Sequence, residues 1–519
     1  MHTHSFFVAV VHHAAGLSAV YALSFLDGRA IQWQNEFFIM PFYKGNRMFS
    51  QEKYHAYCAI LHEELVPAMG CTEPVAIAYA AAYAREVLGQ MPERLKLRVS
   101  ANIVKNARGV TVPNTGGLRG IEAAAVAGAV GGDAARKLEV LQALNPEHIA
   151  DVIELLGQGM CEVELAEGIE GLYIEVEALG KNRGDPSASS SRVVVEHTHT
   201  GITRVERDGK TVFSLQEVAK GKQDSLSSSP QSRWPDECAG CDAAPRCVGQ
   251  SYISLDRHEY AWLNVDDILE FAEHVQIRDV GKLLRAQIEL NKAIAEEGLR
   301  GDWGVSVGKT LMKYRDARDV RVRARALAAA GSDARMAGCA LPVVINSGSG
   351  NQGLTVSLPV IAFAESLGVD EEKLIRALVV SNLVSLEQKE YVGKLSAYCG
   401  AVSAAVGAAA GIAYLGGADY GQISKVIIDS VATSDGILCD GAKSSCAAKI
   451  AVALESAMLG LDLGMKEGTR FREGEGLTGA GVEETLRNVG IVAKEGMRRT
   501  DVEIIRVMLG NPAGEASSR

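Results

Sequence analysis

The spacing of apolar residues changes along the 519-residue chain, and these changes predict where helices and strands lie. After residue 48, apolar positions recur every three or four residues, which predicts two helices, at 49–66 and 75–88. Farther along, apolar and polar residues alternate as they do in strands, at 95–99, 173–176 and 192–195. Asp208-Gly209 separates two alternating arms within 204–213, which is a strong signal for a β-hairpin.

From residue 265 to the C-terminus the helical period dominates. The predicted helices are 265–274, 280–297, 309–330, 371–381, 400–415, 423–431, 447–461 and 482–507. The expected fold class is therefore α+β, with an N-terminal α/β region that contains antiparallel strands and a C-terminal domain that is mainly α-helical. Residues 395–418 carry no charge and are long enough to span a bilayer, but Ala and Gly dominate there, which favours a buried helix of a soluble protein.

Two segments interrupt these patterns. Residues 1–47 form an extension with an almost uncharged run at 6–26, for which a start codon assigned too far upstream, a weak membrane anchor and an ordered extra element all stay open. Residues 222–250 are rich in Ser, Pro and Gly and are typical of a loop or an insertion. The expected organisation is the extension at 1–47, an α+β region at 48–264 that contains the insertion, and a helical domain at 265–519.

Composition and charge exclude several classes of protein. The formal net charge is −11 and no stretch combines many basic residues with aromatic ones, so nucleic acid is not an expected partner. Ten cysteines in 519 residues are too sparse for a disulfide-rich secreted scaffold, and we expect reduced thiols and a cytoplasmic location. Glycine is abundant, with 54 residues, whereas aromatic residues make up only 6%, so small side chains must fill much of the packing.

Two stretches of the C-terminal half have residues suited to chemistry. The segment 346–353, NSGSGNQG, can expose backbone N–H groups to an anion, a carboxylate or a phosphate, although a tight turn explains it as well. Cys399, Cys439 and Cys446 have small neighbours that leave room for an iron–sulfur cluster, although buried free cysteines are common in protein cores.

A third group of cysteines lies inside the predicted insertion. Cys238, Cys241 and Cys247 have the spacing C-x2-C-x5-C. A zinc site needs four ligands, and no partner pair with C-x2-C spacing lies nearby. Exposed thiols in a loop are therefore favoured over a metal site.

Five motifs then occur in an order that resembles one enzyme family. They are Cys71-Thr72-Glu73-Pro74, SANIVKN at 100–106 with Pro113, GSDARMAG at 331–338, NSGSGNQG at 346–353 and CDGAKSSC at 439–446. Together they resemble the L-cysteine desulfidase family, which is related to the alpha chain of iron–sulfur L-serine dehydratases. The resemblance spans residues 48–510 and leaves the N-terminal extension and the 238–247 loop outside it.

The resemblance implies a cofactor and a base. An oxygen-sensitive [4Fe-4S] cluster would be held by Cys399, Cys439 and Cys446, with one iron left open as a Lewis acid for substrate. Cys71 would remove the Cα proton. Its predicted place at a helix N-terminus, with Thr72 as the N-cap, is expected to lower the pKa of the thiol. The helical domain would then be the catalytic, serine-dehydratase-alpha-like domain.

The implied reaction is β-elimination of a small amino-acid substrate, L-cysteine, to sulfide, pyruvate and ammonia, with no need for PLP. The candidate substrate-binding residues are Ser347, Ser349, Asn351, Arg335 and His199. Further polar candidates near the site are Lys105, Asn102 and Asn106. L-Serine dehydratase is the alternative activity, and a non-catalytic iron–sulfur sensor is the alternative of another class. No membrane partner is expected, and a homo-oligomer is left open.

Overall fold

The computed structural model describes residues 7–14, 17–26, 29–30, 50–169, 171–180, 189–216 and 260–510. The predicted insertion at 222–250, with its three cysteines, lies outside these residues. Contacts divide the chain into two units, Met1–Met48 and Phe49–Arg519. The first unit contains an antiparallel sheet of three strands in the order β1-β2-β3, with β1 at Phe7–Ala14, β2 at Leu17–Leu26 and β3 at Arg29–Ala30.

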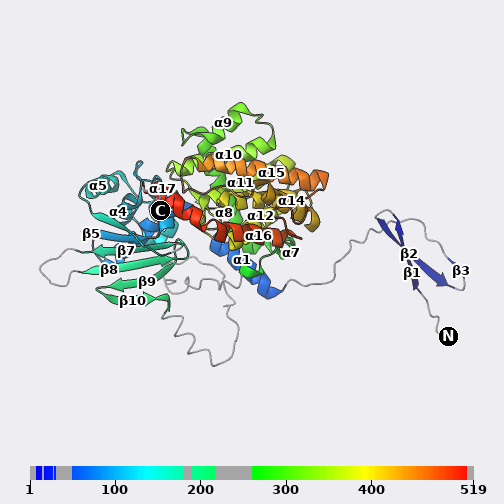
Figure 1. Cartoon of the computed structure of the whole chain (residues 1–519), viewed down its shortest axis with the longest axis horizontal. Coiled ribbons are helices and arrows are strands. Elements are labelled where there is room, and N and C mark those ends of the chain that lie inside the picture. The colour runs from blue at the N-terminus through cyan, green and yellow to red at the C-terminus, as the bar shows by residue number, and fades with distance from the viewer. Residues whose placement is uncertain are drawn as a thin grey trace, which may run out of the picture. The chain divides into compact units, whose positions relative to one another are not determined.

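The N-terminal part of the second unit is built on a six-stranded sheet in the order β10-β9-β8-β7-β5-β6 (Figure 1). Its strands are β5 (Arg94–Val99), β6 (Cys161–Leu165), β7 (Tyr173–Leu179), β8 (Ser190–Glu196), β9 (Ile202–Arg207) and β10 (Lys210–Ser214). The β5–β6 pair is parallel and the other pairs are antiparallel. Buried and exposed residues alternate along β5, which confirms its predicted pattern. Asp208 and Gly209 both have positive φ, as the predicted two-residue hairpin requires.

Helices precede this sheet or connect its strands. They are α1 (Gln51–Glu64), α2 (Thr72–Leu88), α3 (Ala101–Ala107), α4 (Ile121–Gly131) and α5 (Pro146–Gly157), with a short helical turn η1 at Ala134–Glu139. The side chain of Ser50 caps α1 by accepting a hydrogen bond from the backbone N–H of Lys53 at 3.1 Å. Helix α2 contacts α4 and strands β7 and β8, so α2 and α4 form a layer on one face of the sheet.

The C-terminal part of the second unit is a body of helices (Figure 1). These are α7 (Val265–His274), α8 (Ile277–Arg300), α9 (Val307–Tyr314), α10 (Val320–Met336), α11 (Gly350–Leu367), α12 (Glu371–Val392), α13 (Gly400–Leu415), α14 (Tyr420–Ser434), α15 (Cys446–Asp462), α16 (Val482–Ile491) and α17 (Arg498–Met508). Three short helical segments accompany them, η2 (Tyr260–Trp262), η3 (Leu463–Glu467) and η4 (Val492–Gly496). Together with the mixed sheet, this confirms the α+β fold class.

Helix α13 lies at the centre of the helical body. Its residues are buried from Ala401 to Leu415, and it contacts α11, α12, α14 and α15. A Cβ atom on Gly407 would lie 2.4 Å from the backbone oxygen of Ser381, so glycine there allows α12 and α13 to approach closely. The prediction of a buried helix is confirmed, and no helix among the described residues is long and apolar enough to cross a membrane.

Two helix predictions need correction. The segment 309–330 is not one helix, because α9 ends at Tyr314 and α10 begins at Val320. The charged residues between them favour a break, and the Asp319 side chain caps α10 by accepting from the N–H of Arg321 at 2.9 Å. The segment 482–507 is divided as well, by the π-helical turn η4. Helices α3, α4, α5 and α11 have no counterpart among the predicted elements.

A small two-stranded sheet joins the two parts of the second unit. Strand β4 (Pro67–Met69) pairs antiparallel with β11 (Pro342–Val344), which lies just before the glycine-rich segment. Gly70 follows β4 with a φ of +52°, and a Cβ atom there would lie 2.8 Å from the Pro113 ring. The sharp turn that this glycine permits leads directly into Cys71. In this way β4 and β11 bring the start of α2 and the start of α11 to the same region.

Candidate active site

Cys71 is the N-cap residue of α2, and it is almost fully buried, with an exposed fraction of 2%. Thr72 is the first residue of the helix, so the prediction of Thr72 as the N-cap is wrong by one position. The Cys71 Sγ donates a hydrogen bond to Glu73 Oε2 at 3.1 Å. Burial and the negative charge of Glu73 raise the pKa of the Cys71 thiol well above its ordinary value, although Arg335 acts in the opposite direction. The expected lowering of this pKa is therefore wrong, because burial outweighs the helix N-terminus.

Glu73 is the second polar group at this position. Its Oε2 also accepts a hydrogen bond from the Thr72 hydroxyl at 3.1 Å, and its Oε1 lies 3.8 Å from His199 Nε2. Burial alone would raise the pKa of this carboxyl, but His199 and the Cys71 S–H lower it to about 2. Glu73 is therefore a buried carboxylate at neutral pH, and no sequence pattern had assigned it a role.

The glycine-rich segment forms a tight turn that runs into helix α11. The backbone N–H groups of Asn346 and Ser349 each donate to the carbonyl of the other, at 3.1 and 3.0 Å. Ser347 and Gly348 between them have positive φ, and the first intrahelical hydrogen bond joins the N–H of Gly353 to the Ser349 carbonyl. The N–H groups just before Gly353 point out of the helix N-terminus, which is the arrangement that binds anions.

A buried polar network fixes this turn from behind. The Asn346 amide donates to the Asn382 side chain at 3.0 Å, and Asn382 donates to Gln287 at 2.9 Å. Ser385 donates to the Asn346 amide oxygen at 3.0 Å. On the other side, a Cβ atom on Gly348 would lie 2.8 Å from the His199 ring. The turn therefore lies between a rigid network and the histidine that faces Glu73.

Arg335 extends from the last turn of α10 toward the same turn and has an exposed fraction of only 1%. Its Nη1 donates to the Asn351 side chain at 3.1 Å, and its guanidinium lies so close to Gly350 that a Cβ atom there would be 2.3 Å from Nε. Among the described residues, Nε and Nη2 of Arg335 have no hydrogen-bond partner, and neither has the hydroxyl of Ser347. Buried donors of this kind require a partner, and a carboxylate suits them. The side chain of Ser349 makes no contact that assigns it a role, although its backbone forms the turn.

The three C-terminal cysteines occupy two adjoining segments. Cys399 is the N-cap of α13, and Cys439 lies in a strand-like segment beside it, with hydrogen bonds from Cys399 N–H to Ile437 O at 2.8 Å and from Cys439 N–H to Ala397 O at 2.7 Å. Cys446 is the first residue of α15. The two thiols interact with each other, which lowers the pKa of Cys439, whereas the Cys439 sulfur and burial raise the pKa of Cys399.

Two buried lysines lie near these sulfur atoms. Lys105, at the end of α3, helps to lower the pKa of Cys439 through its charge, and its backbone oxygen would lie 2.2 Å from a Cβ atom on Gly441. Its Nζ pairs with Asp501 of α17 at 2.5 Å. Lys389 of α12 is buried, which lowers its pKa to about 8 against the opposing effect of Cys439 and Cys399. Both ammonium groups suit a site that gathers negative thiolates.

One apolar cluster joins Cys71, the candidate base, to residues 439–446, which we call the cysteine loop. Cys71, Val110 and Met336 form its buried core, and Ala442 and Cys446 pack against it. Asn106 contributes its backbone oxygen, 3.8 Å from the Cys71 Sγ, and the buried side-chain oxygen of Asn102 has no partner among the described residues. The segments that carry the five motifs therefore meet in one place, although they are far apart in the sequence.

The donor set fits an iron–sulfur cluster better than a single metal ion. Among the described residues, no group of three or more His, Cys, Asp or Glu side chains is arranged to hold a metal ion. In an iron–sulfur cube each thiolate binds a different iron, so the ligands surround a larger object than one ion. Three thiols, small neighbours and two buried ammonium groups match the chemistry of such a cluster.

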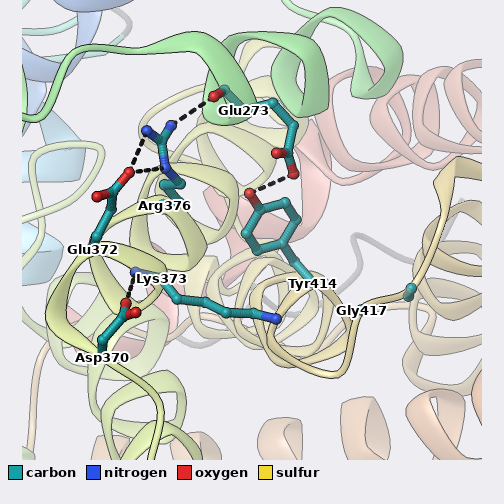
Figure 2. Close-up of a pocket in the computed structure, with 8 residues that line it drawn as sticks. Glu273, Asp370, Glu372, Lys373, Arg376, Tyr414 and Gly417 are labelled. Atoms are coloured by element: carbon teal, nitrogen blue, oxygen red, sulfur yellow. Dashed lines mark hydrogen bonds and ion pairs between the residues drawn. The ribbon is translucent and has the colours of Figure 1, made fainter.

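A surface pocket elsewhere does not resemble this site. It encloses about 360 Å³ and is lined by residues of α7, α12 and the end of α13, among them Glu273, Arg376 and Tyr414 (Figure 2). Arg376 donates to Glu372 and to the backbone oxygen of Glu273, and Tyr414 donates to the Glu273 carboxylate. These charged groups satisfy one another, and no residue predicted for the active site lines this pocket.

The convergence of the motifs agrees with the comparison to known sequences. Residues 135–506 match the profile of the family described as serine dehydratase alpha chain. The chain belongs to the serine dehydratase alpha chain family. Membership confirms the predicted relation to that chain, indicates a lyase-type enzyme and agrees with the iron–sulfur dependence that is general in the family.

Relatives of similar length extend the match beyond the family profile. A UPF0597 protein of Lachnoclostridium phytofermentans is 47% identical over 457 residues, covering 88% of this chain and 100% of the relative. UPF0597 proteins of Desulfitobacterium hafniense and Treponema denticola are 45% and 41% identical, covering 89% and 88% of this chain and 98% and 99% of the relatives. The names of these relatives state no substrate.

Several residues of the site were not singled out from the sequence. Glu73 is inside the Cys71-Thr72-Glu73-Pro74 motif, so its place beside the cysteine was visible, although its contact with His199 was not. Lys389 lies beyond the predicted helix 371–381, in the part of α12 that the sequence pattern missed, and Asp501 reaches Lys105 across 396 positions of sequence. No local pattern could have paired these groups.

Proposed function

We propose that this serine dehydratase alpha chain relative catalyses iron–sulfur-dependent β-elimination of L-cysteine to sulfide, pyruvate and ammonia. The observation that carries the proposal is the packing of Cys71 and Met336 with Cys446, beside Arg335. This contact gathers a candidate base, a candidate cluster ligand and a buried cation for a substrate carboxylate. An α-amino acid that loses a β-substituent needs these three functions in one site.

The chain's own residues have separable tasks in this reaction. Arg335, with two unpartnered nitrogens, and the Ser347 hydroxyl bind the substrate carboxylate, helped by the N–H groups at the start of α11. Asn351 holds the guanidinium in place through its hydrogen bond to Nη1. Burial of these groups excludes water and strengthens each charge–charge contact.

Cys71 is the candidate base, and Cys399, Cys439 and Cys446 are the candidate ligands of a [4Fe-4S] cluster. When bound, the cluster would supply an open iron that acts as a Lewis acid on the leaving group. The Cys71 S–H donates a hydrogen bond to Glu73, and the thiol becomes a base only after this proton has passed to solvent water before substrate binds. The thiolate then takes the Cα proton as the β-substituent departs, and the resulting enamine hydrolyses to pyruvate and ammonia.

L-Serine is the second candidate substrate, because the matching family is described as serine dehydratase. Anaerobically reconstituted protein is therefore assayed with each amino acid for pyruvate, and with L-cysteine for sulfide. We expect sulfide and pyruvate in equal amounts from L-cysteine. Pyruvate from L-serine without sulfide from L-cysteine would contradict the proposal and support the dehydratase.

Cysteine variants separate the proposed roles. Cys71→Ala should keep the iron content and the cluster absorbance but lose turnover, whereas Cys439→Ala should lose iron. Cys58→Ala is the matched control, since Cys58 lies on α1 outside the site and should change neither property. Unchanged turnover in Cys71→Ala would exclude Cys71 as the base, and full iron content in Cys439→Ala would exclude it as a ligand. A cluster that binds without any turnover would favour the sensor instead.

A further inference from the structure

The candidate site contains a buried anion with incomplete partners. The Glu73 carboxylate has an exposed fraction of only 8% as a residue, yet within the described part of the chain the only basic nitrogen within 4.0 Å is His199 Nε2. That nitrogen lies 3.8 Å from Oε1, which is too long for a hydrogen bond. The remaining side-chain donors, from Cys71 and Thr72, are neutral and both reach Oε2. A buried carboxylate in this condition favours a cation near Oε1.

The same site contains a buried cation that also has incomplete partners. Arg335 has no carboxylate within 4.0 Å among the residues that the structure describes, and its one side-chain acceptor is the neutral amide of Asn351. Its Nε and Nη2 are buried and have no hydrogen-bond partner in the described part of the chain. Removing a guanidinium from water costs free energy that one neutral hydrogen bond does not offset. The unpartnered nitrogens therefore indicate an anionic ligand.

Cys71 lies within the influence of both charges. Glu73 contacts its sulfur at 3.1 Å, and Met336, the residue that follows Arg335, packs in the same buried cluster as Cys71. An α-amino acid carries an ammonium and a carboxylate on one carbon atom, so its two charges complement this pair of buried groups. A ligand placed between Glu73 and Arg335 would have its Cα near the Cys71 sulfur.

We propose that Glu73 binds the α-ammonium group of the substrate and thereby selects α-amino acids over acids that lack the amino group. This inference rests on the proposed function and adds a specificity-determining residue to it. His199 then supports the same carboxylate through Nε2, which lies 3.8 Å from Oε1, and its ring also lies against Gly348 of the glycine-rich turn. Thr72 and Cys71 both donate to Oε2, which leaves Oε1 for the ammonium.

Two ligands that differ in one group test the proposal without turnover. L-Alanine has the α-ammonium but no leaving group, and L-lactate has a hydroxyl in place of the ammonium. Calorimetric titration of the reconstituted wild-type enzyme should show tighter binding of L-alanine by about tenfold or more, the range expected for a hydrogen bond to a charged group. In Glu73→Gln this preference should fall to near one, while L-lactate affinity stays close to the wild-type value.

Two further variants complete the design. Glu73→Asp keeps the charge and should restore part of the preference for L-alanine, whereas Arg335→Gln should weaken both ligands alike. An unchanged preference in Glu73→Gln would overturn this inference and leave the proposed elimination intact. If the wild-type enzyme bound neither ligand, the proposed amino-acid site itself would be wrong. Lactate binding by Glu73→Gln also shows that the variant is folded at the site.

Discussion

Gly441 offers a sharp test of how the cysteine loop is held. This glycine lies between Cys439 and Cys446 with a φ of +91°, and a Cβ atom would be 2.2 Å from the backbone oxygen of Lys105. Gly441→Ala therefore adds two costs, a strained backbone and a collision with another backbone. Gly417 is a matched control, because its φ is +79° and nothing lies within 4 Å of a Cβ atom there.

The magnitudes separate the two variants. A non-glycine residue in the left-handed region costs about 1 to 2 kcal/mol, and both variants carry this cost. Forcing an extra carbon into a filled space costs about 1 to 3 kcal/mol more, and only Gly441→Ala carries it. We therefore expect Gly441→Ala to lower the free energy of unfolding by about 2 to 5 kcal/mol, and Gly417→Ala by about 1 to 2 kcal/mol.

Urea unfolding measures both values, and iron analysis after anaerobic reconstitution measures the effect on the proposed cluster. Because the loop must move away from Lys105 to admit the methyl group, Gly441→Ala should also bind less iron than Gly417→Ala. Equal unfolding free energies for the two variants would refute the close approach of the loop to α3. Unequal stability with equal iron would instead show that the approach does not position the ligands.

Three other predictions concern groups around the site. Asp501→Asn should lower the free energy of unfolding by about 3 to 5 kcal/mol, because it leaves the buried Lys105 without its charged partner. The variant should also be cleaved faster by proteases within α17. An unchanged rate of cleavage there would argue against this ion pair. Burial raises the pKa of Asp333 to about 6, so the folded state binds more protons than the unfolded state between about pH 4 and 6 and loses about 3 kcal/mol as pH rises through that window. Urea unfolding from pH 4 to 7 should show that the stability of Asp333→Asn does not fall in this way. If the free energy of unfolding changed with pH equally in the wild type and the variant, the prediction would be wrong. Asn382→Leu should cost about 1 to 3 kcal/mol for each polar group left unpaired, Asn346 included, and should weaken L-alanine binding in calorimetry; wild-type affinity would mean that the network does not hold the turn.

The period of apolar residues predicted those elements that have the same pattern of burial along their whole length. Exposed and buried residues alternate along β5, as polar and apolar residues do in its sequence. The buried helix α13 has the bounds that its sequence predicted. Periodicity failed where a local cap or turn interrupts a continuous pattern, as at Asp319 between α9 and α10. It also missed α11, since the Gly, Ser and Asn residues of its first turn resemble a loop until the helix behind them is seen.

The sequence motifs named most residues of the candidate site, but they did not predict how the fold shifts the pKa of the Cys71 thiol. The motifs identified Cys71, Arg335 and the three C-terminal cysteines, and the structure brings their segments together. The direction of the Cys71 pKa was wrong because burial depends on the whole fold and cannot be read from a helix N-terminus. The role proposed for Glu73 likewise depends on what its carboxylate lacks, which only the packed site reveals.

The ion pair between Lys105 and Asp501 has a consequence for synthesis. The two residues are 396 positions apart, and ribosomes add about 5 to 20 residues each second, so Lys105 waits on the order of 20 to 80 s for its partner. Until Asp501 has been synthesised, the charge of Lys105 is not paired, and the loop that contains Cys439 cannot pack against its final neighbours. Assembly of the proposed cluster before release from the ribosome would therefore meet an unfinished site, so we expect its iron and sulfide to be delivered after the last helix emerges.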